Sequence, residues 1–343
     1  MPWRSIRGHD RIVEDLRLVM AQGRFPHAFL FVGPEGIGKR GFALTLAQAL
    51  LCERHPVDAL DPCGECPGCR QVEAQTHPDL HLAARPEEKH ELPIAVIRAL
   101  CDEMALKPMR GPRKVAIVDD ADALNEEAAN AFLKTLEEPS EGSVLILVGT
   151  SAELQLDTIL SRCRVVRFDS LPEPELAAVL LESGIAAGKT EAHRLAKLGE
   201  GSVARARGLA DADLESFRRS MIDEITSAGG FDPSALARRL EAFVKEAGKE
   251  SLAQRLRASL LVSELARFFR GVLWQTAGLE SPAPDLADRL AAATVAERLE
   301  PEDVFLLADR CLEADYHIRR MAYLPVALDA LTSDLGRFLQ PRR

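Results

Sequence analysis

The sequence predicts an α/β domain built on a parallel sheet, followed by two domains made only of helices. In the first half of the chain, short β-rich runs alternate with amphipathic helical patterns, which is typical of a parallel sheet covered by helices. After about residue 171 the strand signal disappears and only helical patterns remain. At 343 residues, the chain is also long enough for two or three domains that each bury a core.

The elements of the α/β domain follow one another along residues 1–170. Five short apolar runs are the predicted strands: Ala28–Val32, Asp79–Ala83, Val115–Val118, Val144–Val148 and Val165–Phe168. Three stretches between these runs carry apolar residues at spacings of three and four, which predicts helices. These helices are Gly38–Leu51, Ile94–Ala105 and Asn125–Leu136.

The rest of the chain is predicted to form two helical domains. Short helical patterns over residues 171–211 indicate a small domain, and longer amphipathic patterns over residues 212–343 indicate a larger one. The main patterns are Glu175–Ser183, Glu191–Leu198, Ser251–Gln275 and Pro301–Phe338.

The charge and the apolar pattern exclude two classes of protein. With 43 basic and 53 acidic residues the formal net charge is −10, which repels polyanions at long range. We therefore expect no autonomous nucleic-acid-binding protein, and any contact with DNA to be local or made through partners. Apolar runs such as Ala28–Val32 are only five residues long, and the N-terminus lacks the apolar core of a signal peptide. These features predict a cytoplasmic protein with reduced thiols.

A glycine-rich segment after the first strand has the pattern of a phosphate-binding P-loop. It reads Gly33-Pro34-Glu35-Gly36-Ile37-Gly38-Lys39-Arg40. Backbone N–H groups around Gly33, Gly36 and Gly38, together with Lys39, could hold a polyphosphate. The last position should be Ser or Thr, whose hydroxyl binds Mg²⁺, whereas Arg40 offers only donors. Arg40 thus argues against metal-dependent hydrolysis, and a loop kept only for structure is the alternative interpretation.

Two carboxylates follow the third predicted strand and resemble a Walker B element. In Val115-Ala116-Ile117-Val118-Asp119-Asp120, a buried strand delivers both aspartates at the edge of the sheet where α/β proteins bind ligands. Asp119 would hold a metal ion through water. Asp120 stands where ATPases of this type usually have a Glu that activates water, and it is one methylene shorter. The alternative is that these aspartates cap a helix. The Walker B interpretation therefore depends on their occurring together with the P-loop.

Four of the seven cysteines form a compact pattern with metal-ligand spacing. Cys52, Cys63, Cys66 and Cys69 give C-x₁₀-C-x₂-C-x₂-C on a short insertion. Four thiolates suit tetrahedral Zn²⁺ with no open position, which predicts a structural site. A disulfide pair or free thiols are the alternatives.

The order of several motifs resembles a known family. Its members share Pro26–Gly33, the P-loop, the cysteine insertion, Asn130–Pro139 and Thr158–Cys163 in this order. On these residues the chain resembles the delta-prime family of bacterial DNA polymerase III clamp-loader subunits, which are AAA+ proteins. The resemblance covers roughly residues 1–210, and the C-terminal third matches more loosely through its helical character.

The resemblance implies an architecture and roles for single residues. Residues 1–170 would be the AAA+ domain with the zinc-binding insertion, residues 171–211 a helical lid, and residues 212–343 a helical collar for oligomerisation. Arg162, in Ser161-Arg162-Cys163, would be an arginine finger acting in trans on ATP of a neighbouring motor subunit. Thr150 falls near the sensor-1 position.

The start of the sensor-2 helix departs from the pattern of the motor subunits. Gly201-Ser202 resembles this start, but Ala204 stands where motor subunits have Arg, and Arg205 is out of register. This departure weakens the expectation of a self-sufficient ATPase.

The function implied is that of a structural stator in the replicative polymerase holoenzyme. The subunit would help to load the sliding clamp onto primed DNA in a hetero-oligomeric ring with motor and delta-type subunits. An ATP-hydrolysing motor subunit of the gamma/tau type is one alternative, against which Arg40, Asp120 and Ala204 argue. A stand-alone P-loop switch or zinc-bearing interaction module is the other. Whether ATP and Mg²⁺ bind at all is left open by the sequence.

Overall fold

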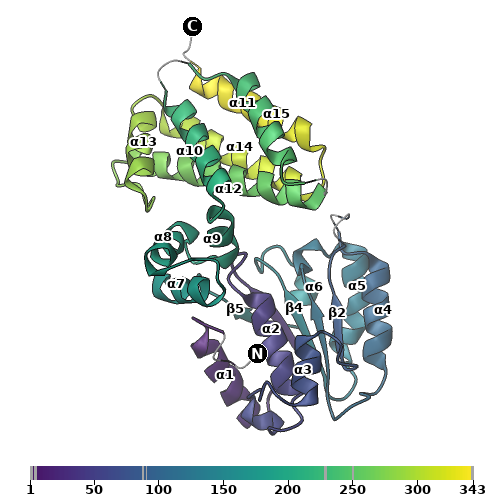
Figure 1. Cartoon of the computed structure of the whole chain (residues 1–343). Coiled ribbons are helices and arrows are strands. Elements are labelled where there is room, and N and C mark those ends of the chain that lie inside the picture. The colour runs from purple at the N-terminus through teal and green to yellow at the C-terminus, as the bar shows by residue number, and fades with distance from the viewer. Residues whose placement is uncertain are drawn as a thin grey trace. The chain divides into compact units, whose positions relative to one another are not determined.

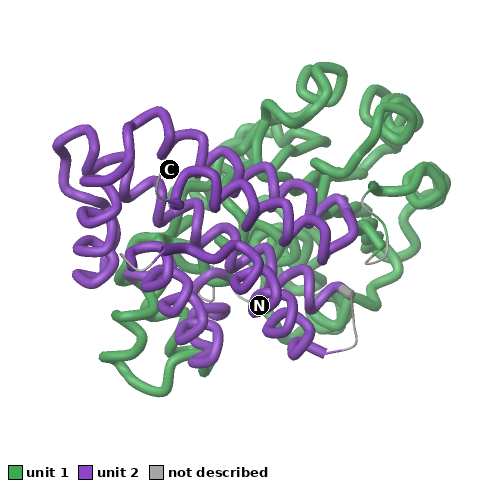
Figure 2. Tube along the Cα trace, turned by 90° about the horizontal axis from the view of Figure 1, so that it is seen from above, with its two compact units in different colours: residues 1–196, 200–204 green, residues 197–199, 205–343 purple. Residues whose placement is uncertain are grey.

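The chain forms two compact units, seen in a computed structural model that describes residues 3, 6–86, 89, 91–227, 230–248 and 251–340. The first unit comprises residues 1–196 and 200–204, and the second comprises residues 197–199 and 205–343 (Figure 2). The first unit holds the sheet, and the second consists of helices (Figure 1). The boundary expected near residue 211 between a lid and a collar stays a prediction.

A five-stranded parallel sheet in the order β2-β3-β4-β1-β5 forms the centre of the first unit. Its strands are β1 (Ala28–Val32), β2 (Leu80–Ala83), β3 (Lys114–Val118), β4 (Ser143–Val148) and β5 (Arg164–Arg167). Each predicted strand is confirmed to within one residue at either end. All four strand pairings are parallel and β1 lies between β4 and β5, so the predicted α/β class with a parallel sheet is confirmed.

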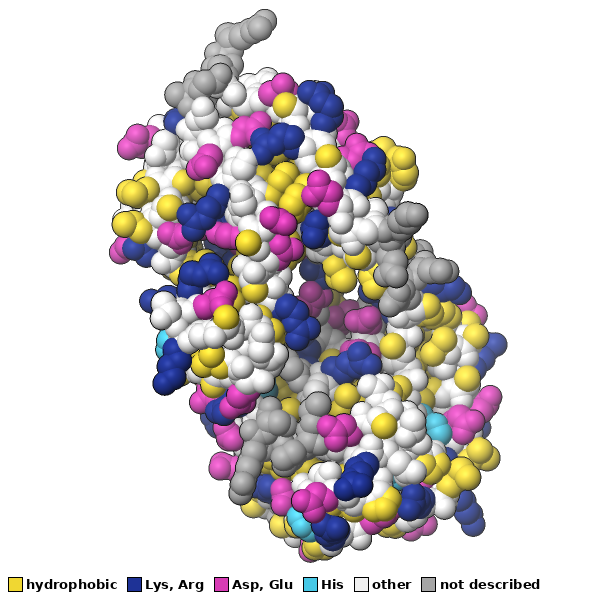
Figure 3. All heavy atoms as spheres, viewed as in Figure 1, with side chains coloured by type: hydrophobic (Ala, Val, Ile, Leu, Met, Phe, Trp, Pro, Cys, Tyr) yellow, Lys and Arg dark blue, Asp and Glu magenta, His cyan; other side chains and the backbone are white. Residues whose placement is uncertain are grey.

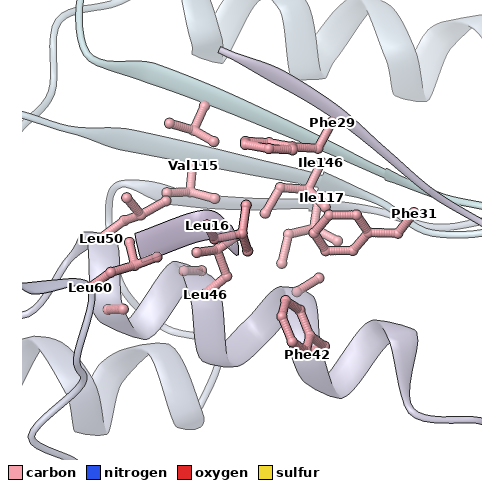
Figure 4. Packing of buried hydrophobic residues seen from close by; sticks show 14 of the residues in the cluster. Leu16, Phe29, Phe31, Phe42, Leu46, Leu50, Leu60, Val115, Ile117 and Ile146 are labelled. Carbon is pink, nitrogen blue, oxygen red and sulfur yellow. The ribbon is translucent and has the colours of Figure 1, made fainter. Parts of the chain in front are cut away.

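Alternating side chains on the strands bury both faces of the sheet. On one face, Phe29 and Phe31 pack with Phe42 and Leu46 against α1 (Asp10–Ala21) and α2 (Lys39–Leu50), as Figure 4 shows. On the other face, Leu30 and its neighbours pack against the helices α4 (Ile94–Ala105), α5 (Glu126–Glu137) and α6 (Asp157–Leu160). Because successive residues of a strand point to opposite faces, these continuous apolar runs require helices on both sides.

Helix starts follow from local capping residues. Asn125 caps α5 by accepting a hydrogen bond from the N–H of Ala128 at 2.9 Å. Asp211, Asp232 and Asp285 do the same for α10 (Ala212–Thr226), α11 (Pro233–Lys245) and α13 (Leu286–Ala296). Such a side chain satisfies backbone donors that have no partner within the helix. The predicted helices Gly38–Leu51, Ile94–Ala105 and Asn125–Leu136 are confirmed as α2, α4 and α5.

The remaining helices are divided between the two units. They are α3 (Pro67–Glu73), α7 (Glu173–Glu182), α8 (Lys189–Gly199), α9 (Val203–Leu209), α12 (Ser251–Thr276), α14 (Pro301–Arg319) and α15 (Leu324–Leu339).

The single helical pattern predicted over Pro301–Phe338 is wrong in one respect, because the chain turns between α14 and α15. Met321 has a left-handed backbone (φ 65°), and Pro325 lies in the first turn of α15, where a proline fits a helix start.

The surface carries charges of both signs. Lys and Arg side chains lie among Asp and Glu side chains over the face drawn in Figure 3. Among the described helices, none combines the length and the apolar character needed to cross a lipid bilayer.

Candidate functional site

The P-loop lies between β1 and α2, with its backbone in conformations that favour glycine. Gly33, Gly36 and Gly38 have φ values of 150°, 74° and 99°. A Cβ on Gly33 would collide with the carbonyl of Phe168, and one on Gly36 would lie 2.5 Å from Oγ of Ser202. The loop therefore needs glycine for both its conformation and its close neighbours.

Lys39 is folded inward onto the loop that it closes. It is the first residue of α2, its side chain is buried, and Nζ donates to the carbonyls of Gly33 and Pro34 at 2.6 Å each. Burial lowers the pKa of Lys39, because the charged form loses solvation. A phosphate at this loop would have to compete with the two carbonyls for the ammonium group.

Arg40 pairs with the first carboxylate of the Walker B-like element. Its Nε lies 3.3 Å from Oδ2 of Asp119, which directly follows β3. Burial raises the pKa of Asp119, aided by the charge of Asp120 and opposed by Arg40. Mg²⁺ requires oxygen ligands, yet position 40 supplies no hydroxyl and the carboxylate already faces a guanidinium. These residues therefore do not fit a P-loop magnesium site.

The second carboxylate faces another arginine. Asp120 has a left-handed backbone (φ 54°), and its Oδ2 lies 3.5 Å from Nε of Arg85, which follows β2. Asp120 precedes a short 3₁₀ turn, but its side chain makes no capping hydrogen bond there. Both aspartates of the element thus have a cationic partner from their own chain.

A third carboxylate, which the sequence reasoning missed, binds Thr150, the residue predicted near the sensor-1 position. Oδ2 of Asp122 accepts hydrogen bonds from the backbone N–H and the hydroxyl of Thr150, at 2.6 and 2.7 Å. Oδ1 of Asp122 accepts one from Nε2 of Gln155 at 2.5 Å. The carbonyl of Thr150 accepts the N–H of Gly33 at 3.0 Å, so this network is joined directly to the P-loop. The available signal was the third Asp in Asp-Asp-Ala-Asp after the strand.

The segment after Gly201 lies on the P-loop within the first unit. The hydroxyl of Ser202 donates to the carbonyl of Glu35, and the N–H of Val203 donates to the carbonyl of Gly36, both at 2.9 Å. Ala204 places its methyl group against Gly36, so the position at which the resemblance predicts an Arg in motor subunits is apolar here.

In the second unit, Arg205 forms a mostly buried ion pair. Its Nε and Nη2 donate to the carboxylate of Glu264 on α12, at 2.6 and 2.9 Å. The arginine beside the sensor-2 position is therefore engaged with its own helical unit.

Arg162, the candidate finger, follows α6 and is held by three groups. Its Nε donates to Oε1 of Glu137 at 2.8 Å, and its Nη2 donates to the same oxygen. Its Nη1 donates to the carbonyl of Thr158 and to Oγ of Ser161, at 2.9 Å each. The side chain remains 30% exposed. Beside it, burial raises the pKa of the Cys163 thiol to about 12, which suits an inert packing residue.

The four cysteines of the insertion converge on one point. Cys52 follows α2, Cys63 lies in a loop, and Cys66 and Cys69 lie at the start of α3. All four Sγ atoms lie within 4.8 Å of one another. The Cys52–Cys66 and Cys63–Cys69 distances are 4.0 and 3.9 Å. Tetrahedral Zn²⁺ with Zn–S bonds of about 2.3 Å would need about 3.8 Å between sulfurs, so these residues fit the metal.

Backbone donors surround the sulfurs of the cluster. The N–H groups of His55, Cys66 and Cys69 donate to Sγ of Cys52, Cys63 and Cys66 at 3.3–3.4 Å. Burial opposes ionisation of Cys63, but hydrogen bonds from the backbone of Glu65 and Cys66 lower its pKa to about 6. All four cysteines are free, and these sulfur separations are too long for disulfide bonds of about 2.05 Å.

Comparisons with known proteins match this chain to subunits of DNA polymerase III. Residues 8–172 match the family model described as DNA polymerase III, delta subunit. The chain is 45% identical over 139 residues to the DNA polymerase III subunit delta′ of Pseudomonas aeruginosa, which covers 40% of this chain and 41% of that protein. It is 32% identical over 278 residues to the DNA polymerase III subunit tau of Escherichia coli, covering 79% of this chain and 41% of that protein.

A solved structure is similar over nearly the whole length. It is a DNA polymerase III gamma subunit-related protein from Thermotoga maritima, with a TM-score of 0.43, 17% identity, and coverage of 96% of this chain and 99% of that chain. The chain spans about two fifths of the length of the two curated relatives described above.

Proposed function

The chain belongs to the DNA polymerase III delta-subunit family of clamp-loader proteins, and from this membership we propose that it is a delta-prime-like stator of the clamp loader. As a stator it would hold its place in a hetero-oligomeric ring and hydrolyse no ATP of its own. The ring would contain motor and delta-type subunits and would load the sliding clamp onto primed DNA in the cytoplasm.

The observation that carries this proposal is the ion pair between Arg40 and Asp119. A motor subunit needs this carboxylate for Mg²⁺ and a hydroxyl at position 40 for the same ion. Here a guanidinium neutralises the carboxylate, and Lys39 is bound to carbonyls of its own loop. Phosphoryl transfer requires stabilisation of the negative charge that develops on the phosphates, which Mg²⁺ would provide at this position. Because the ion pair occupies the position of the metal, the site favours a structural role over ATP hydrolysis.

Arg162 supplies the stator's proposed chemical contribution. A guanidinium placed on the phosphates of a neighbouring subunit stabilises the negative charge of the transition state, which is worth roughly 10³–10⁵ in rate in other systems. Arg162 is partly exposed at the end of a short helix, as a group acting outside its own P-loop must be.

The cysteine cluster has a structural part in the proposal. Cys52, Cys63, Cys66 and Cys69 would hold Zn²⁺, which supplies a fourfold cross-link and leaves no position open for chemistry. The ion would fix the insertion to the end of α2, where the side chain of Gln48 also donates to the carbonyl of Cys69 at 2.8 Å.

Contact with DNA is proposed to occur through the assembled ring. The net charge of −10 disfavours binding of the free chain to a polyanion. Contacts to clamp and DNA would therefore form at positions set by the other subunits.

A motor subunit is the second candidate, because the similarity to subunit tau extends over 79% of the chain. The two functions differ in ATP hydrolysis by the purified chain, compared with the chain mixed with candidate motor and delta-type subunits. A stator is inactive alone and raises hydrolysis by the mixture, whereas a motor hydrolyses ATP through its own P-loop. A stand-alone P-loop or zinc module, the third reading, would enter no ring.

A further inference from the structure

The guanidinium of Arg162 has almost no donor left for a second anion. It carries five N–H groups, and four of them are used: two by Oε1 of Glu137, one by the carbonyl of Thr158 and one by Oγ of Ser161. The Nε/Nη2 edge, which matches a carboxylate or a phosphate with two parallel N–H groups, is the edge that Glu137 occupies. A phosphate that binds Arg162 in this manner must therefore take the place of Glu137.

We propose that Glu137 is a positioning residue that stores Arg162 and is displaced when Arg162 engages a phosphate of the neighbouring subunit. This inference rests on the proposed role of Arg162 as an arginine finger. In the stored state the carboxylate competes with the phosphate for the same edge of the guanidinium. The fraction of time for which Arg162 is available is then set by the strength of its pair with Glu137.

The partners of Arg162 differ in how they would respond to its movement. Thr158 and Ser161 lie within four residues of Arg162, in α6 and the turn that follows it, and can keep Nη1 while the other edge changes partner. Glu137 comes from the end of a different helix, α5, which Phe132 and Leu136 anchor in the core. The contact between Glu137 and Arg162 is therefore the one that joins two separate elements.

Solvent exposure makes the contact exchangeable. The side chains of Arg162 and Glu137 are 30% and 48% exposed, so water can replace either partner. Glu137 is the last residue of α5, where the negative end of the helix dipole disfavours a carboxylate. Arg162 compensates this charge while stored, and solvent screens it after release. An ion pair of this kind favours the stored position of Arg162, yet a phosphate can displace Glu137 from it.

The proposal is tested by steady-state ATP hydrolysis of loaders reconstituted with the wild-type or the variant chain, compared at equal amounts of assembled complex. Glu137→Gln keeps the size of the side chain but removes its charge, so the part of the rate that depends on Arg162 should rise about two- to fivefold. The rise should appear in kcat and leave KM for ATP unchanged, because the finger acts on developing charge. In the double variant with Arg162→Ala the rise should disappear. Glu138→Gln is the matched control and should behave as wild type.

Two results would overturn the inference, and they are distinguishable. If Arg162→Ala lowers the rate but Glu137→Gln leaves it unchanged or lower, the finger stands and the storage role of Glu137 is wrong. If Arg162→Ala has no effect, the finger itself fails and the storage role fails with it. Glu137→Ala, at the same exposed position, repeats the test with a truncated side chain.

Discussion

The guanidinium of Arg40 lies against the carboxylate of Asp119, with 3.3 Å between Nε and Oδ2. One residue is the last of the P-loop, and the other directly follows β3. In a hydrolysing P-loop protein, Mg²⁺ stands between the groups at these two positions, held by a hydroxyl and a carboxylate. Here the chain supplies the positive charge itself, and this relationship leads to the first three predictions.

Arg40→Thr should create magnesium-dependent nucleotide binding. The substitution removes the cation from Asp119 and supplies the missing hydroxyl ligand. A fluorescent ATP analogue should then bind about tenfold more tightly with Mg²⁺ than with EDTA, whereas wild type should show no such difference. Arg40→Ala, which frees Asp119 without adding a hydroxyl, should show a smaller difference. Equal binding by Arg40→Thr in both buffers would mean that Arg40 is not what excludes the metal.

The isolated chain should hydrolyse ATP at a negligible rate. Arg40 removes a Mg²⁺ ligand, Asp120 is short for a base that activates water, and Ala204 supplies no sensor arginine. The measurement is phosphate release by the purified chain, with Lys39→Ala as the control for a contaminating ATPase. A turnover on the order of 1 s⁻¹ that Lys39→Ala abolishes would favour the motor function instead.

Asp119→Asn should stabilise the isolated chain at neutral pH. Burial raises the pKa of Asp119 above its ordinary value of 3.8, so ionisation costs more free energy in the folded chain than in the unfolded chain. The amide removes this cost. The loss of the ion pair with Arg40 costs little, because Arg40 is half-exposed and water screens the pair. The free energy of unfolding at pH 7 should therefore rise.

The gain from Asp119→Asn should depend on pH in a defined direction. It should shrink as the pH falls through the raised pKa, and vanish below the unfolded value, where wild-type Asp119 is neutral in both states. Denaturant unfolding at pH 7 and pH 4 measures this difference, and the half-exposed Asp120, as Asp120→Asn, is the control. Destabilisation by Asp119→Asn at both pH values would show that the pair with Arg40 outweighs the burial cost.

The purified chain should contain one equivalent of Zn²⁺. Four sulfurs within 4.8 Å can close a tetrahedral shell, and its removal leaves a short insertion without a cross-link. Stripping the metal with a chelator should lower the unfolding midpoint by at least about 5 °C. Cys66→Ser should lose the metal, whereas Cys101→Ser, outside the cluster, should keep it. Less than about a tenth of an equivalent in wild type, with four reactive thiols, would refute the site.

Arg162→Ala should reduce DNA-stimulated ATP hydrolysis by the assembled loader while leaving folding and assembly nearly intact. The side chain is partly exposed and its ion pair lies at the surface, so its loss costs about 1 kcal/mol or less of stability. The reduction should be partial if other sites in the ring have fingers of their own. Arg162→Lys should recover little, because a lysine cannot present two parallel donors. Unchanged ATPase and clamp-loading rates with both variants would reduce the subunit to a scaffold.

Much of the first unit was determined by local sequence. Runs such as Ala28–Val32 and Val144–Val148 are apolar throughout, so they could form either strands buried on both faces or short core helices. The short length of these runs and the turn residues beside them favoured strands. The P-loop and the cysteine cluster were readable for a similar reason. Their chemistry depends on spacings of a few residues, which the covalent chain fixes before any folding.

The tertiary structure decided which charged groups meet. No spacing in the sequence indicates that Arg40 faces Asp119, that Glu137 holds Arg162, or that Asp122 accepts both donors of Thr150. Each pair joins ends of different elements, and the parallel order of the sheet brings those ends together. The sequence by itself therefore determined the fold class and the candidate groups. The partner of each group depended on packing, because a surface arginine is within reach of many carboxylates until the backbone excludes all but a few.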